Sequence, residues 1–354
     1  MIEKLGLAEV YVFDTSKTTK KELTGIIDWC DTVITQSPAG VQSVAMVLGY
    51  QERGKVVVID YDDLIYSCSP FNPGYKTLGI KEVKTIEKDG TENWIWKDNT
   101  MGFSIKDNLL RFRSHFDLLR TTDGITVTTP YLRDAYLSYL PECEDKMFVI
   151  PNSIDFDLFK PFPKKQNKRI RIGWIASASH FNEIWIVKEI FDKLYKKYGE
   201  EIIFVQLGDV GDLKKAFTPS QMEYHQFVDL GVYPLKFASL NFDIGICPIF
   251  DDEFNRNKSQ LKWSEYGALK IPSVCSDLPP YSCVADGKTG YLAKTLDEWV
   301  EKLSLLIENE KLRREIGENA FQENYEKFNL EKNAKLWVET YENCHQRIMA
   351  GQPF

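Results

Sequence analysis

The chain has 354 residues, of which 43% are hydrophobic and 27% are charged, and its formal net charge at pH 7 is -8. These values are those of an ordinary globular protein, and the length suggests two domains because single domains usually hold about 100–200 residues. The negative net charge argues against a general attraction to nucleic acid or to anionic lipid.

The first 60 residues alternate between strand-like and helix-like patterns. They predict, in order, a strand, a helix, a strand, a helix and a strand, at residues 9–13, 20–29, 32–35, 41–48 and 55–60. Such an alternation indicates a parallel, doubly wound α/β sheet.

Three aspartates, Asp60, Asp62 and Asp63, end the third of these strands. The carboxyl ends of strands are where ligand-binding groups collect in open α/β sheets, so these side chains are candidates for binding a substrate. Two other interpretations are a helix N-cap or turn and a metal-binding D-x-D motif. We favour substrate binding or capping.

Residues 67–100 break the pattern with prolines, glycines and aromatic residues. Asp89 and Gly90 predict a hairpin here, because Asp-Gly is a favoured two-residue turn. Trp94 and Trp96 in its second strand could stack on a sugar or a base, or they could anchor the hairpin to its domain. Farther along, residues 104–120 predict a helix with five basic side chains, followed by a strand at 124–129 and a helix at 130–139.

The second half begins with residues 169–181, a β-rich strand that ends in a small-residue loop before an amphipathic helix near residue 182. Gly173, Ser177 and His180 fall in this run. Backbone amides at such a loop can receive phosphate oxygens. The alternatives are close packing at Gly173 and a water-facing helix residue at His180.

Residues 243–291 are the most informative segment of the chain. A strand at 244–249 opens into a polar loop, a short helix and a second strand at 273–276. The polar side chains of the loop and helix are Arg256, Asn257, Lys258, Ser259, Lys262 and Glu265.

These side chains suit a nucleotide-sugar ligand. Lys and Arg can neutralise a diphosphate, and a carboxylate can accept hydrogen bonds from ribose hydroxyls. Lys258, Lys262 and Glu265 are spaced by four and three residues, so they could share one helical face. The alternative is an exposed charge cluster on a solvated helix.

The segment resembles the donor-binding region of family 4 glycosyltransferases, which are retaining enzymes of the GT-B fold. The matching residues are Asp243, Lys258, Glu265, Gly267, Pro272 and the turn at 286–292. Residues 148–155 resemble the linker between the two domains of that family, and the resemblance is strongest over 145–340.

The resemblance implies an α/β GT-B fold of two Rossmann-like, doubly wound domains that face a central cleft. Residues 1–150 would form the acceptor-side domain, joined by a last helix at about 335–354, and residues 151–334 would bind the donor. It further implies transfer of a hexose or pentose from a nucleoside-diphosphate sugar, most simply a UDP or GDP sugar, to an acceptor hydroxyl. Configuration would be retained, with no metal and no cofactor.

The resemblance also implies roles for single residues. Lys258, with Arg256 or Lys262, would neutralise the leaving diphosphate, and Glu265 would hold the ribose. Amides near Ser177 and His180, together with Ser259, would complete the phosphate cradle, with Gly173 and Asn257 in the donor site. On the acceptor side stand Asp60, Asp63, Trp94 and Trp96, and Asp62 is a candidate catalytic residue.

One residue departs from the family pattern. Many members have two glutamates eight positions apart, and Asn257 stands where the first would be. One alternative is therefore an inactive scaffold subunit that binds a nucleotide sugar. The acceptor could be a saccharide, a lipid-linked saccharide or a DNA base, so a second alternative is an enzyme that glycosylates a flipped hydroxymethyl-pyrimidine base of phage type. The sequence is compatible with a homo-oligomer.

Location and redox state follow from two further patterns. No apolar run approaches the ~20 residues that a transmembrane helix needs, and the N-terminus lacks the apolar core of a signal peptide. We therefore expect a cytoplasmic protein. Its seven cysteines contain no C-x-x-C pair, which indicates reduced thiols rather than a disulfide framework or a zinc site.

Overall fold

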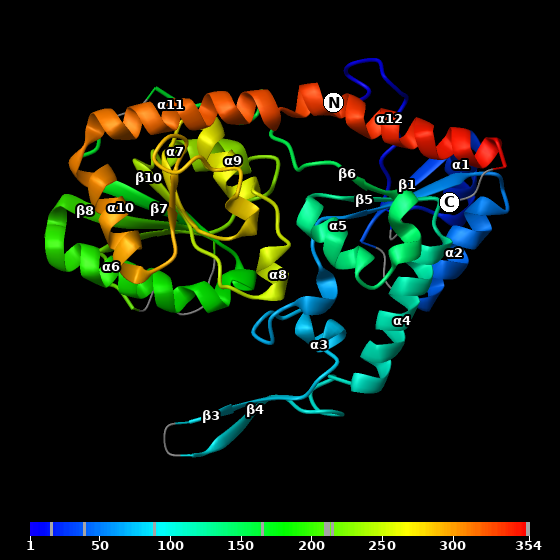
Figure 1. Ribbon diagram of the computed structural model, residues 1–354, viewed down its shortest axis with the longest axis horizontal. Helices are drawn as coiled ribbons and strands as arrows, with labels where there is room; N and C mark the ends of the chain where they lie inside the picture. Colours follow the sequence, from blue (N-terminus) through cyan, green and yellow to red (C-terminus); the bar gives the residue numbers. More distant parts are fainter. Residues whose placement is uncertain are drawn as a thin grey trace. The chain divides into compact units, whose positions relative to one another are not determined.

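The computed structural model describes residues 1–14, 17–37, 40–87, 90–163, 166–208, 213 and 216–351. The chain divides into two compact units, each with a parallel sheet between helices (Figure 1). Unit 1 comprises Met1–Pro70, Gly74–Pro151 and Glu331–Phe354, and unit 2 comprises Phe71–Pro73 and Asn152–Leu330.

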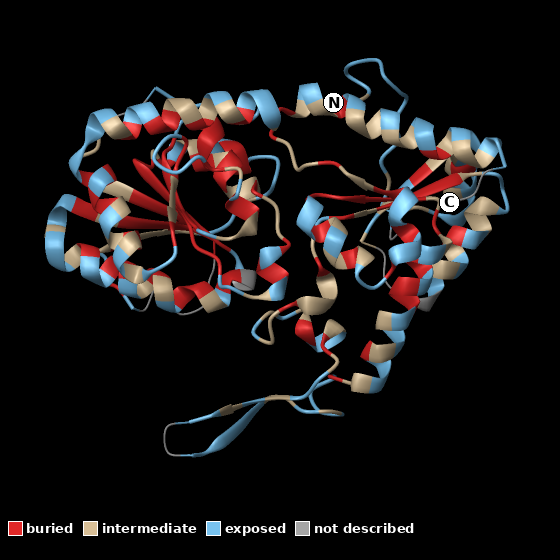
Figure 2. Cartoon of the chain, in the orientation of Figure 1, coloured by how far each residue is buried: buried red, intermediate tan, exposed pale blue. Residues whose placement is uncertain are grey.

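Unit 1 contains a parallel sheet of four strands. Their order is β1 (Thr32–Gln36), β2 (Val56–Tyr61), β5 (Gly124–Val127) and β6 (Met147–Val149). The apolar side chains of β2 are all buried (Figure 2), as expected of a parallel strand that is covered on both faces.

The described part of unit 1 contains six α-helices. They are α1 (Lys20–Trp29), α2 (Val41–Gln51), α3 (Tyr75–Leu78), α4 (Ile105–Thr121), α5 (Pro130–Leu137) and α12 (Leu330–Met349), with short 3-10 helices at Ile65–Ser67 and Pro141–Lys146. The predicted start of α1 is marked by a capping box, in which Thr19 and Glu22 each accept the other's main-chain N–H.

The last helix, α12, covers one face of the unit 1 sheet. Its Cys344 is fully buried against Val56 and Val58 of β2. A methyl group on Gly124 of β5 would lie only 2.6 Å from the Cys344 sulfur, so only glycine fits there without a shift. Helix α12 thus closes the core of unit 1.

A two-stranded hairpin of β3 (Val83–Ile86) and β4 (Glu92–Trp96) projects from unit 1 (Figure 1). The predicted turn residue Asp89 lies outside the described residues. Trp96 anchors the base of the hairpin, since its Nε1 donates to the Pro70 carbonyl over 2.6 Å. Trp94 is 46% exposed farther along the arm.

Unit 2 contains a parallel sheet of six strands. Their order is β12 (Tyr291–Ala293), β11 (Ser273–Ser276), β10 (Ile244–Cys247), β7 (Ile170–Ile175), β8 (Ile202–Leu207) and β9 (Met222–His225). The first strand, β7, has β8 on one side and β10 on the other, so the strand order reverses beside it. Ligands of open α/β sheets bind at the carboxyl ends of the strands at such a switch point.

Helices cover both faces of the unit 2 sheet (Figure 1). The α-helices are α6 (Ile184–Tyr198), α7 (Tyr233–Ser239), α8 (Glu253–Arg256), α9 (Leu261–Ala268), α10 (Leu296–Glu308) and α11 (Glu310–Lys327), and 3-10 helices lie at Ala178–Glu183, Gly199–Glu201 and Pro279–Tyr281. One buried layer joins Trp174 to α6 and α10, and another joins Phe242 to α7 and α9. Among the described residues, no helix is long and apolar enough to cross a membrane.

Two predicted elements were wrong in their extent. Residues 9–13 form no strand, and Val12 is 89% exposed, because β-propensity alone does not create a strand without a hydrogen-bonded neighbour. The last helix, expected at about 335–354, begins already at Leu330, because the two residues before it pair with Ile154.

Candidate functional site

Contacts at the carboxyl edge of the unit 2 sheet join α9 to strand β7. The ammonium of Lys262 donates to the carbonyl of Ile175, the last residue of β7. One turn later, Tyr266 donates to the carbonyl of Gly173 over 3.0 Å. The structure therefore brings Lys262 and Glu265 on α9 next to the loop that carries Ser177 and His180.

The side chains of Lys262 and Glu265 are both partly buried here, and their ionised forms carry opposite charges. Burial lowers the pKa of Lys262, and the carboxylate of Glu265 acts in the opposite direction. Burial raises the pKa of Glu265 to about 7, while Lys262 and a hydrogen bond from Tyr233 act to lower it. That bond runs from the Tyr233 hydroxyl to Oε2 of Glu265 over 3.1 Å, and it leaves the other carboxylate oxygen for further partners.

Lys258 lies in the loop between α8 and α9, so the predicted helical face shared with Lys262 and Glu265 was wrong. Helix α8 ends at Arg256 with Asn257 as its C-cap, and α9 begins only at Leu261. The Lys258 ammonium lies 4.7 Å from the ring centroid of Phe254, which holds it by a cation–π contact.

Arg256 is half exposed and engaged by a neighbouring carboxylate. Its Nε and one terminal nitrogen donate to Asp251 over 2.6 and 2.9 Å. Arg256 is thus held in a bidentate ion pair, and a phosphate that binds Arg256 would have to replace the Asp251 carboxylate.

Asn257 and Ser259 make structural hydrogen bonds. Asn257 is buried, and its Nδ2 donates to the Glu253 carbonyl over 2.7 Å. The Ser259 hydroxyl oxygen accepts from Nδ2 of Asn152 over 2.9 Å. Asn152 thereby reaches the loop in front of α9, a contact that the sequence analysis did not foresee.

Glu183 was also missed from the sequence. It is 1% exposed, and its Oε1 accepts the main-chain N–H of Phe250 over 2.9 Å. Its Oε2 lies 3.7 Å from Nδ1 of His180. The only signal in the sequence is the three-residue spacing of His180 and Glu183 at a helix start, which is common on surfaces.

Opposite effects set the charges of this pair. Burial lowers the pKa of His180 to about 4, and nearby Lys262 adds to this effect. Burial acts to raise the pKa of Glu183, but His180 and the Phe250 N–H bring it below its ordinary value. At neutral pH a neutral imidazole therefore stands beside an ionised, buried carboxylate. His180 is largely buried at 9% exposure, not water-facing.

Gly173 and the main-chain N–H of His180 have structural roles. A methyl group on Gly173 would come within 2.1 Å of the Phe242 ring, so glycine is required for packing at that point. The main-chain N–H of His180 donates to the Ser177 carbonyl over 2.9 Å, which removes one amide from the expected phosphate cradle.

Asp243 matches the acidic strand-end residue of the family that the segment resembles. It precedes β10, at the amino end of the sheet. Its Oδ2 accepts from Nδ2 of Asn167 over 2.7 Å and from the main-chain N–H of Arg171 over 3.0 Å. Asp243 therefore fastens the beginning of β7 rather than a ligand.

The aspartates of unit 1 lie at the carboxyl end of β2. Asp60 Oδ1 accepts from the Thr126 hydroxyl over 2.7 Å, and burial raises the pKa of Asp60. Asp62 is exposed, whereas the Asp63 carbonyl accepts from the Tyr136 hydroxyl over 3.2 Å. Trp94 and Trp96 belong to the hairpin that projects away from this sheet (Figure 1). Within the described residues, no group of three or more His, Cys, Asp or Glu is arranged to hold a metal ion.

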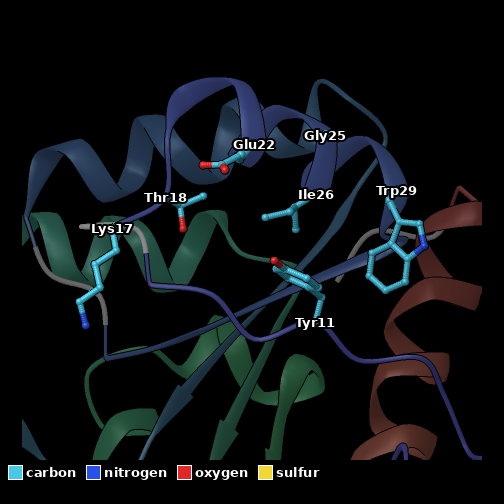
Figure 3. Close-up of a pocket in the computed structure, with 7 residues that line it drawn as sticks. All are labelled: Tyr11, Lys17, Thr18, Glu22, Gly25, Ile26 and Trp29. Atoms are coloured by element: carbon cyan, nitrogen blue, oxygen red, sulfur yellow. The ribbon is translucent and has the colours of Figure 1, made fainter.

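Two hollows of unit 1 contain none of the predicted residues. The first, of about 600 Å³, is lined by Tyr11, Lys17, Thr18, Glu22, Gly25, Ile26 and Trp29. Figure 3 shows Tyr11 facing Ile26 of α1, with Lys17 at one end and Trp29 at the other. A second hollow, of about 1300 Å³, continues from Tyr11 along β1 and α12. Neither gathers the several cations that a diphosphate requires.

No family model and no curated protein matches the chain by its sequence. Solved structures do match. A glycosyltransferase from Rickettsia africae superposes with a TM-score of 0.63 at 14% identity, covering 97% of this chain and 86% of that one. HepE from Anabaena in complex with UDP and glucose has a TM-score of 0.59 at 14% identity, covering 91% of this chain and 81% of that one.

TarM is a third similar structure. A TarM variant from S. aureus, in complex with fondaparinux, α-GlcNAc-glycerol and UDP, has a TM-score of 0.53 at 18% identity over 84% of this chain. The chain spans 58% of the length of TarM.

The chain has the GT-B fold. The predicted fold class, an α/β protein with two Rossmann-like domains, is thereby confirmed. At 14–18% identity the likeness is one of fold, and what the chain does follows from its own residues.

Proposed function

We propose that the protein is a glycosyltransferase that transfers a sugar from a nucleoside-diphosphate sugar to an acceptor hydroxyl. The observation that carries the proposal is the meeting of α9, with Lys262 and Glu265, and the loop after β7 at the switch point of the unit 2 sheet. Two solved structures with this fold, TarM and HepE, are complexes with UDP.

The lysines supply the electrostatic part of the reaction. When the glycosidic bond breaks, negative charge grows on the leaving diphosphate, and fixed cations stabilise that charge without a metal ion. Lys262 is partly buried, and this burial lowers its pKa. A diphosphate at this place would favour its charged form, and Lys258 in the preceding loop would add a second cation.

Glu265 and His180 supply hydrogen bonds. Oε2 of Glu265 is held by Tyr233, so the carboxyl group has a fixed orientation toward ribose hydroxyls. The neutral imidazole of His180 can donate to a sugar hydroxyl without competing for the diphosphate as a second cation would. Ser177 and Ser259 would bind phosphate oxygens beside them.

We further propose that the donor is a UDP sugar and that the anomeric configuration is retained, as in the family that residues 243–291 resemble. The acceptor would bind to unit 1 near Asp62, with Asp60 and Asp63 shaping that surface. No Asp or Glu is assigned as a nucleophile, and the transfer is proposed to be independent of metal.

The test is thermal stabilisation of the full chain by UDP, GDP, ADP, dTDP and CDP and their sugars. A ligand that binds only the folded state at one hundred times its Kd should add about 2.7 kcal/mol of stability. A shift with one nucleotide, followed by slow release of sugar from its donor, supports the enzyme. Tight binding without any turnover would indicate a scaffold, and no shift with any nucleotide contradicts the proposal.

A further inference from the structure

Two hydrogen bonds join Asn152, at the start of unit 2, to the loop that precedes α9. Asn152 is the first residue of unit 2 after Pro151 ends a segment of unit 1. Its Nδ2 donates to the Ser259 hydroxyl oxygen over 2.9 Å, and its main-chain carbonyl accepts from Nε2 of Gln260 over 3.0 Å. One residue therefore holds two successive residues of the candidate diphosphate loop.

The bond from Asn152 orients the Ser259 hydroxyl. A hydroxyl has one O–H to donate and two lone pairs to accept with. The Asn152 amide occupies a lone pair, and within the described part of the chain the hydroxyl donates to no acceptor. Its proton is therefore available to a ligand. An O–H that donates to a phosphate oxygen makes a charge-assisted bond, which is stronger than a neutral one.

The surrounding backbone keeps Asn152 in place. Gln260 is 4% exposed, and its carbonyl accepts the N–H of Ser264 at the start of α9. Two residues beyond Asn152, the N–H of Ile154 donates to the Phe328 carbonyl over 2.7 Å, and its carbonyl accepts from Leu330 over 2.9 Å. Hydrogen bonds on both sides therefore fix the position of Asn152, which orients the Ser259 hydroxyl in the absence of a ligand.

We propose that Asn152 is a positioning residue of the donor site, which fixes the Ser259 oxygen so that the hydroxyl donates to a diphosphate oxygen. This inference rests on the proposed nucleotide-sugar site. It adds a residue that acts through Ser259 without touching the ligand, at the point where the chain passes between the units.

The experiment measures the Kd of UDP by calorimetry for the full chain and for Asn152→Ala, Ser259→Ala and the double variant. Each single substitution should raise the Kd by about tenfold or more, because a hydrogen bond to a charged group contributes about 1.5–3 kcal/mol. The double variant should be no weaker than Ser259→Ala, because Asn152 acts through that hydroxyl. The Kd of uridine, measured by competition, should not change.

Two further variants separate positioning from folding. Asn152→Asp keeps the size of the side chain but can only accept, so it would draw the Ser259 proton away and repel phosphate. We expect a larger loss of UDP affinity than for Asn152→Ala. Asn167→Ala is the matched control, since it removes hydrogen bonds to Asp243 and Asn241 at the amino end of β10. It should lower the unfolding temperature and leave the Kd of UDP unchanged.

The outcomes distinguish the two proposals. If Asn152→Ala binds UDP like the parent while Ser259→Ala binds it weakly, the positioning role is refuted and the donor site stands. The positioning role is also refuted if the rise in the Kd of UDP for the double variant equals the product of the rises for the two single variants. An equal rise in the Kd of uridine refutes it as well. If the parent protein binds no nucleoside diphosphate, the proposed function fails, and the role of Asn152 fails with it.

Discussion

Replacing Lys262 with Met should weaken nucleoside-diphosphate binding while costing the fold little. The ammonium lies where burial lowers its pKa, with the Ile175 carbonyl as its hydrogen-bond acceptor. Met keeps most of the aliphatic stem and removes a charge that is costly to bury. The lost hydrogen bond leaves one carbonyl without this donor, at a cost of about 1–3 kcal/mol, and relief from burying the charge offsets part of that.

The effect on binding follows from Coulomb's law. A unit charge at 4 Å from a phosphate charge interacts by about 4 kcal/mol at an effective dielectric constant of 20. Desolvation removes part of this, so a net loss of about 1.5–3 kcal/mol is expected, which corresponds to roughly a 10- to 100-fold rise in Kd.

The assay is calorimetric titration of UDP into Lys262→Met and the parent, beside a denaturant titration of each without ligand. Lys188→Met is the control, since Lys188 is a partly exposed lysine of α6 whose ammonium pairs with Asp192. Equal UDP affinity in Lys262→Met and the parent would refute the electrostatic role of Lys262. A large loss of stability without ligand would refute the argument about its buried charge.

Three further outcomes are expected. The pKa of Glu265 is raised to about 7. The contribution of Glu265 to the free energy of unfolding is therefore complete below its unfolded pKa of about 4.5 and is lost as the pH rises through 7. Denaturant titrations should show stability falling by up to about 1.4 kcal/mol per pH unit in this range, and Glu265→Gln should remove that fall. The pKa of buried His115 is lowered to about 3, so stability present above pH 6.5 should fall as pH drops toward 3. In denaturant titrations, His115→Leu should reduce this fall by up to about 1.4 kcal/mol per pH unit, and an unchanged slope would contradict the role of His115. Gly124→Ala should destabilise the protein by about 1–3 kcal/mol through overpacking, and Cys344→Ala in the same chain should restore most of this, because the new methyl group meets the Cys344 sulfur.

The parts of the fold that the sequence predicted well are those with local signals. The helix over α1 was placed at both ends, because Thr19 and Glu22 form a capping box. The strand β11 was placed in full because a short apolar run follows Pro272. Fold class followed from the alternation of such segments, which depends on local pattern alone.

The parts that failed depend on distant partners. The spacing of Lys258, Lys262 and Glu265 allowed one shared helical face, but α8 ends before Lys258 and α9 begins after it. Glu183 and Asn152 belong to no recognisable motif. Their roles depend on hydrogen bonds to Phe250 and Ser259, which are distant in the sequence and become neighbours only in the folded sheet. Whether Arg256 meets a carboxylate likewise depends on how the loop at Asp251 folds back.

The position of α12 along the chain has a further consequence for folding. The helix that buries Cys344 against β2 of unit 1 follows unit 2 in the sequence. The core of unit 1 can therefore be completed only after all of unit 2 has been synthesised. Because Ile154 and Leu330 are hydrogen-bonded to each other, unit 2 has adjoining ends, as an inserted domain does.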